Sequence, residues 1–103
     1  MGTSTMEKII VERIRLDSIK NFIDTLLVHL RYVTRRQVSV IELDKKVELR
    51  VNGDLLIEIH IHKDEKYGGY MLDIYLMRDI PKKTRTLLTN TIHVIVHRII
   101  HGQ

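Results

Sequence analysis

The fold of this chain is decided by residues 47–62, which read VELRVNGDLLIEIHIH. On each side of Asn52-Gly53, apolar and polar side chains alternate, which is the pattern of a half-buried strand. The alternation recurs upstream in VSVIEL (38–43) and downstream in YMLDIYLM (70–77). Short polar or glycine-containing links separate these segments, and short links join antiparallel neighbours. The sequence therefore predicts a meander of hairpins.

The link between the central two strands poses a question of register. Asn-Gly favours a two-residue turn, but that turn would set the inward Leu49 opposite the outward Leu56. A three-residue loop over residues 52–54 instead keeps Leu49 opposite Ile57 on one side of the sheet. We predict the three-residue loop, because the apolar pattern needs that pairing.

Two amphipathic helices are predicted outside this meander. After Leu16 the sequence DSIKNFIDTLLVHLRYVTRR spaces its apolar residues by three and four, with Asp17 or Ser18 as the cap. A second helix follows Pro81, with Thr84 as its cap. Residues 7–16 alternate and are rich in β-branched side chains, which favours a first strand. The predicted order is β-α-β-β-β-β-α: an α+β, two-layer domain with an antiparallel sheet of four to five strands and two helices on one face.

The composition sets the remaining limits. We expect residues 1–5 to be a disordered tail or a remnant of cloning, and residues 6–103 to be a single α+β domain. No apolar run approaches the length of a membrane span, no secretory signal is recognised, and cysteine is absent, so a cytoplasmic protein without disulfides is expected. The chain has 15 isoleucines and no alanine. Such a composition resembles that of small archaeal or archaeal-virus reading frames and fits a heat-adapted protein.

The pair His60 and His62 raises the question of a metal site. Both point to the polar side of their strand, and the register that keeps the faces together sets His60 opposite Asp73 and His62 opposite Met71. Two imidazoles and a carboxylate suit zinc or a similar divalent ion. The alternative interpretation is that both histidines are partly solvated strand residues.

The triplet His60-Ile61-His62 resembles the metal-binding motif of HUH-type replication initiators and relaxases, which cleave single-stranded DNA with a tyrosine on a helix. The resemblance covers three residues and implies a metal-dependent nuclease. Together with Asp73, which the predicted register sets opposite His60, its centre would be His60, His62 and Asp73. The last helix contains no tyrosine, and Tyr32 on the first helix would fit only the order of the relaxases.

A second series of histidines lies on the last helix. His93, His97 and His101 recur at four-residue spacing, which places them along one face, as helical metal sites require. His93 is flanked by Ile92 and Val94, so the general base of the zincin pattern is missing. The alternative interpretation is a favourable interaction of histidines with the helix dipole.

Apolar side chains outside the predicted core point to self-association. Leu87 and Val94 lie almost opposite the main apolar stripe of the last helix, and helices that are apolar on two sides are usually covered on both. Outward Leu56, Met71, Tyr75 and Met77 raise the same question for the open side of the sheet. We therefore predict a homodimer whose interface uses Leu87, Val94, Met71, Tyr75 and Met77.

Basic residues concentrate near two helix ends, whereas residues 37–80 are acidic overall. The six cations are Arg31, Arg35 and Arg36 at the end of the first helix, and Lys82, Lys83 and Arg85 at the start of the second. Cations gain nothing from the dipole at a helix start, and the free amides there already favour phosphate. The pattern predicts contacts with the backbone of DNA or RNA; solvation and ion pairing with the acidic sheet is the alternative.

Other function classes receive no support from the sequence. No Ser/His/Asp series, phosphate-cradling glycine loop, paired carboxylates or small-molecule site stands out. The leading hypothesis is a homodimeric, non-enzymatic protein that binds nucleic acid and needs no cofactor. The alternatives are the metal-dependent nuclease and a purely protein–protein assembly module.

Overall fold

The computed structural model describes residues 5–102 and contains seven elements. They are β1 (Met6–Ile14), α1 (Leu16–Thr34), β2 (Val38–Glu42), β3 (Lys46–Val51), β4 (Asp54–Lys63), β5 (Tyr70–Met77) and α2 (Lys82–Ile99). The predicted order β-α-β-β-β-β-α is confirmed. Of the expected tail only Thr5 is described, and its carbonyl oxygen accepts a hydrogen bond of 2.8 Å from the N–H of Arg78.

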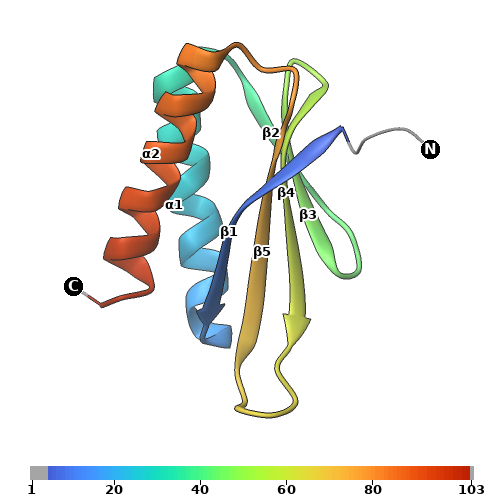
Figure 1. The fold of residues 1–103 in the computed structure, drawn as a ribbon, viewed down its shortest axis with the longest axis vertical. Coiled ribbons are helices and arrows are strands. Elements are labelled where there is room, and N and C mark those ends of the chain that lie inside the picture. Colours follow the sequence, from blue (N-terminus) through green and yellow to red (C-terminus); the bar gives the residue numbers. More distant parts are fainter. Residues whose placement is uncertain (1–4, 103) are drawn as a thin grey trace.

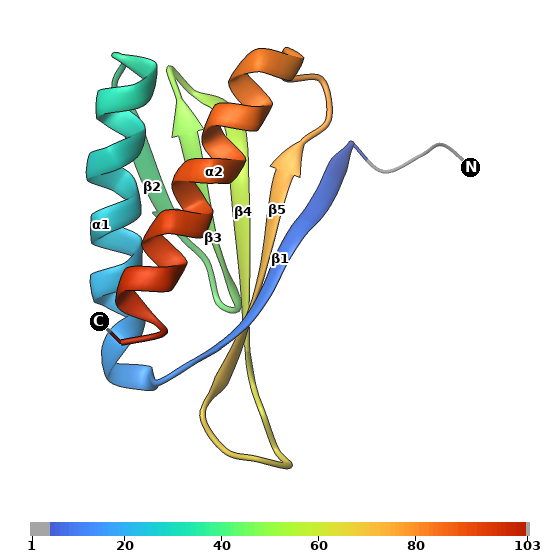
Figure 2. The same cartoon turned by 60° about the vertical axis from the view of Figure 1, so that its left-hand side comes forward.

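The five strands form one antiparallel sheet in the order β1-β5-β4-β3-β2. The first strand therefore lies beside the last, and β1 and β2 are the two edges. Both helices run antiparallel to each other over one face of the sheet (Figures 1 and 2), as predicted. We call the opposite side of the sheet the open face.

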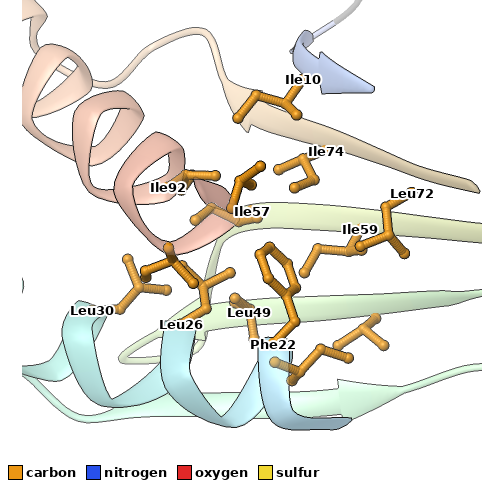
Figure 3. Packing of buried hydrophobic residues seen from close by; sticks show 14 of the residues in the cluster. Ile10, Phe22, Leu26, Leu30, Leu49, Ile57, Ile59, Leu72, Ile74 and Ile92 are labelled. Atoms are coloured by element: carbon orange, nitrogen blue, oxygen red, sulfur yellow. The ribbon is translucent and has the colours of Figure 1, made fainter. Parts of the chain in front are cut away.

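The hydrophobic core lies between the sheet and the helices. Alternate residues of the strands point toward the helices, and the chain's one phenylalanine, Phe22, projects from α1 among Leu49 and Ile59 (Figure 3). The fully buried side chains are Phe22, Leu26, Leu30, Leu49, Ile57, Ile59, Leu72, Ile74, Leu76, Leu88, Ile92 and Ile95. These are the positions given by period two in the strands and by three and four in the helices.

The β3–β4 hairpin differs from the predicted loop. Asn52 and Gly53 both have positive φ, +52° and +89°, and form a two-residue turn in which Val51 faces Asp54. Leu49 nevertheless pairs with Ile57, because the register shifts by one residue after Leu49. A bulge on β4 thus absorbs the extra residue that we had assigned to the loop. The predicted pairing is correct, and the predicted loop is wrong.

Both helices begin before their predicted caps. α1 starts at Leu16 and α2 at Lys82, so Asp17, Ser18 and Thr84 lie within the first turns, and neither N-terminus has a side-chain cap. In α2 the position before the helix is Pro81, whose φ of −53° is already near the helical value. Directly after Pro81, α2 thus starts without the hydroxyl cap that the sequence predicts.

Candidate functional site

The basic residues of the two helices lie at the same end of the domain. Because α1 and α2 are antiparallel, the C-terminus of α1 and the N-terminus of α2 reach the same end, where the two helices stand apart (Figure 2). Arg35 ends α1 in the left-handed conformation, with φ of +56°, and its N–H donates to the carbonyl oxygen of Arg31. Five of the six predicted cations are exposed, and we call them the basic end: Arg31, Arg35, Arg36, Lys82 and Lys83.

Arg85, the sixth predicted cation, is held inside the fold. Its guanidinium binds the carboxylate of Glu7 on β1 and donates to the carbonyl oxygen of Met77 at 2.7 Å. The side chain is only partly exposed, and it joins the first strand, the end of β5 and the start of α2. Arg85 therefore has a structural position, and we leave it out of the basic end.

Replacing Arg85 with alanine is expected to lower the free energy of unfolding by about 1 kcal/mol, because a charge-assisted bond to a partly buried carbonyl is lost. Urea denaturation followed by circular dichroism measures this. Lys83→Ala, two residues away and exposed, is the matched control and should change stability by less than about 0.5 kcal/mol. Equal effects of the two variants would show that Arg85 is a surface charge like its neighbour.

A hollow of about 600 Å³ adjoins the basic end, between the β3–β4 turn and the segment before α2. Arg36 is in its wall, but so are the carboxylates Asp54 and Asp79. Two acidic side chains make the hollow unsuitable for phosphate. The positive surface is therefore the exposed helix ends themselves.

His60 and His62 lie on the open face in the predicted register, with His60 opposite Asp73 and His62 opposite Met71. Their side chains nevertheless turn to different carboxylates. His62 Nε2 is 3.4 Å from Asp73 Oδ2, whereas His60 Nε2 is 2.9 Å from Glu58 Oε1. Across residues 5–102, no three His, Asp or Glu side chains are grouped so that they could hold a metal ion. The geometry therefore gives the metal-site hypothesis no support.

The tyrosine that a relaxase-like nuclease would need is also misplaced. Tyr32 projects from α1 and is largely exposed, and α1 covers the face of the sheet opposite to His60 and His62. The sheet stands between the tyrosine and the histidines, so one reaction centre cannot include both. The sheet also separates His60 and His62 from the histidines of α2. Of these, His101 lies beyond the helix end at Ile99, and its Nε2 is 3.3 Å from Oε1 of Glu12.

The centre of the open face is a network of ion pairs. Glu48 and Glu58 face each other across β3 and β4, and Lys46 Nζ lies 3.6 and 3.3 Å from their carboxylates. Arg50 binds the far side of Glu48 at 2.9 Å. Burial raises the pKa of Glu58, but hydrogen bonds from His60 and Lys46 lower it further, so its pKa lies below the ordinary value of 4.5. Lys46 and Arg50 thus offset the negative charge of the two carboxylates inside the network.

The predicted interface residues fall into two surroundings. Met71, Tyr75 and Met77 on the open face are half-buried, and Tyr75 packs against His60, with ring centroids 4.6 Å apart, and under Lys8. Leu87 and Val94 on α2 are about half exposed. On the open face the apolar side chains are thus half-buried among charged neighbours, whereas α2 presents apolar side chains to solvent.

Comparison with models of protein families, with characterised proteins and with solved structures gives no match for this chain. Over residues 5–102, no helix is long and apolar enough to cross a membrane.

Proposed function

We propose that this chain is a small homodimeric protein, without a catalytic role, that binds DNA or RNA inside the cell through the basic end. The observation that carries the proposal is that five exposed cations from two distant parts of the sequence gather at one end of the domain. Contact would be mainly with phosphates, because the basic end consists of cations; Tyr32, exposed beside Arg31 on α1, could add stacking on a base.

The ion pairs of the fold favour this proposal over the alternative of charge balance with the acidic sheet. Within residues 5–102 the carboxylates that form ion pairs do so with other cations, including Lys8, Arg13, Lys46, Arg50 and Arg85. In that same span, no side chain of the basic end takes part in an ion pair. The ion-paired carboxylates of the sheet are thus held by cations outside the basic end, and in the described part of the chain the five cations of the basic end keep their charge unpaired.

The proposal predicts binding that weakens steeply with salt. Labelled single-stranded DNA, duplex DNA and RNA of one length are titrated between 25 and 200 mM salt. For duplex DNA, each phosphate contact contributes about 0.9 to the slope of log affinity against log salt. Replacing Arg31, Arg35, Lys82 and Lys83 together with alanine should reduce that slope by up to about 3.6, if each contacts one phosphate, and weaken binding at 50 mM salt at least about tenfold.

The matched control removes the same charge from elsewhere on the surface. Lys20, Lys45, Lys63 and Arg98 are exposed and lie outside the basic end, and their joint replacement with alanine should leave most of the affinity. Equal losses in the two variants would mean that binding follows net charge alone. No affinity at the lowest salt would overturn the proposal and favour a protein–protein assembly module. Cleavage of the single-stranded probe with manganese would instead favour the nuclease.

A further inference from the structure

The outer edge of β2 presents backbone groups that can pair with another strand. Leu43 N donates to Lys46 O, and Asn52 N donates to Gln37 O, so the odd-numbered residues at both ends of this ladder bond to β3. Hydrogen bonding alternates along an antiparallel strand. The N–H and C=O groups of Val38, Val40 and Glu42 therefore point away from β3, along the edge of the sheet.

The two edges of the sheet differ in their protection against such pairing. β1 has a shift of register between Lys8 and Ile10 and carries charges at Glu7, Lys8, Glu12 and Arg13. β2 reads VSVIE, keeps one unbroken register with β3, and contains no proline, lysine or arginine. Bulges, prolines and lysines are the usual means of blocking edge-to-edge association. β2 is the edge that lacks them.

Exposed apolar side chains surround the same edge. Ile41 and Leu43 are 40% and 49% exposed, and Leu16 at the start of α1 is 65% exposed. Leu16 and Leu43 line one hollow between α1 and the strands, of about 490 Å³, together with Ile19, Ile23, Val47 and Ile61. A strand added to β2 would cover side chains that are now in contact with water.

The charges around β2 match a second copy of the same strand. Arg36 precedes the strand and Asp44 follows it; both are exposed, and within residues 5–102 neither side chain takes part in an ion pair. In an antiparallel pair centred on Val40, residue 36 of one copy lies opposite residue 44 of the other. From Arg36 to Asp44 the chain is basic at its start and acidic at its end, so this stretch is complementary to itself when reversed; beyond it, Lys45 of one copy lies opposite Arg35 of the other.

We propose that two copies of this chain associate through β2, pairing antiparallel across a two-fold axis at Val40. The two five-stranded sheets become one continuous sheet, with all four helices on the same face. Arg36 of each copy binds Asp44 of the other, so Arg36 belongs to the dimer and the remaining basic end belongs to nucleic acid. This inference rests on the homodimer of the proposed function. It places the contact surface of that dimer at β2 instead of at Leu87 and Val94.

Disulfide trapping tests the pairing directly, because the chain has no cysteine of its own. In the proposed register Ser39 of one copy faces Ile41 of the other, at a close, non-hydrogen-bonded pair. Ser39→Cys and Ile41→Cys proteins, mixed at low micromolar concentration under mild oxidation, should give a covalent heterodimer in high yield. Leu87→Cys mixed with Val94→Cys is the matched control for the α2 surface. Cross-linking of the α2 pair without the β2 pair overturns the proposal.

Sedimentation tests the same interface without a covalent bond. Arg36→Asp should raise the dimer dissociation constant about tenfold, and adding Asp44→Arg should return it to within about threefold of the parent. Ile41→Lys with Leu43→Lys should give a monomer, since lysines on an edge oppose pairing. Circular dichroism confirms that the variants are folded. A dimer that persists in the double lysine variant, or a charge swap that fails to restore association, overturns the proposal.

Failure here can be told from failure of the proposed function, because sedimentation needs no nucleic acid. The Ile41→Lys, Leu43→Lys protein keeps the basic end intact, so its binding to labelled duplex DNA is measured separately. A parent that is monomeric at all concentrations but binds DNA overturns the β2 pairing and leaves nucleic-acid binding in place. A β2 dimer that binds no nucleic acid leaves the pairing in place and removes the function.

Discussion

Phe22→Ala is expected to lower the free energy of unfolding by about 3–5 kcal/mol, the largest effect of any single substitution we predict. Phe22 is fully buried and reaches from α1 into the centre of the core, beside Leu26, Leu49 and Ile59 (Figure 3). Removing the ring takes away its transfer free energy and leaves a cavity that neighbours on a sheet and two helices cannot close. Urea denaturation followed by far-ultraviolet circular dichroism measures the loss.

Val28→Ala is the control within the same helix, because Val28 is well exposed on α1. It should change the free energy of unfolding by less than about 0.5 kcal/mol. A loss below about 1 kcal/mol for Phe22→Ala would contradict the packing of α1 on the sheet. A loss as large as predicted could by itself leave the variant unfolded at 37 °C, since a small domain is stable by only about 5–15 kcal/mol.

The sequence was sufficient to predict the sheet because alternation specifies a face. Moving a strand by one residue would turn Ile57, Ile59 and the other inward side chains into water, so the pairings of Leu49 with Ile57 and of His60 with Asp73 follow from the pattern. The turn at Asn52-Gly53 was mispredicted because two local rules conflicted. The chain satisfies both by a bulge on β4, a third solution that alternation does not reveal.

The sequence could not predict those features of the candidate site that depend on contacts between distant segments. The pattern placed Arg85 with the other cations at the start of α2, but the fold brings Glu7 on β1 to it. That contact depends on β1 lying beside β5, which no local feature of residues 7–16 indicates. The orientation of His60 toward Glu58 rather than Asp73 is another such case, since both carboxylates lie within reach on the open face.

The charge pattern around β2 is visible in the sequence, but its role could not be predicted from the sequence. The run from Arg36 to Asp44 shows its charge gradient in the printed sequence, yet the gradient has meaning only once β2 is known to be an edge strand. For a central strand the same residues would pair on both sides within one domain. Knowing that β2 is an edge strand of the sheet is thus what makes its charge pattern evidence for an interface.

Lys46→Met is expected to destabilise the protein by about 2 kcal/mol at pH 7, because Lys46 stands between two carboxylates that face each other across strands. Glu48 and Glu58 are mostly shielded from water, and like charges directly opposite each other on a sheet are destabilising. Methionine keeps the apolar part of the side chain and removes only the charge. Lys20→Met, which breaks an exposed pair with Asp24, is the matched control and should cost less than about 0.5 kcal/mol.

The pH dependence identifies the cause of this loss. In the parent the pKa of Glu58 is below 4.5, so its ionised form contributes stability above pH 4.5 that is lost as pH falls through the lowered pKa. Without Lys46, burial and Glu48 oppose ionisation and the pKa of Glu58 rises. The difference between the two proteins should therefore be greatest near pH 7 and shrink toward pH 4, where Glu58 of the variant binds a proton and no longer needs a compensating cation. Denaturation curves from pH 3.5 to 7.5 measure this difference.

A second variant tests the same cause. Adding Glu48→Gln to Lys46→Met should recover most of the loss at pH 7, because one of the two opposed charges is then gone. A difference independent of pH, or no recovery, would mean that Lys46 acts through packing alone.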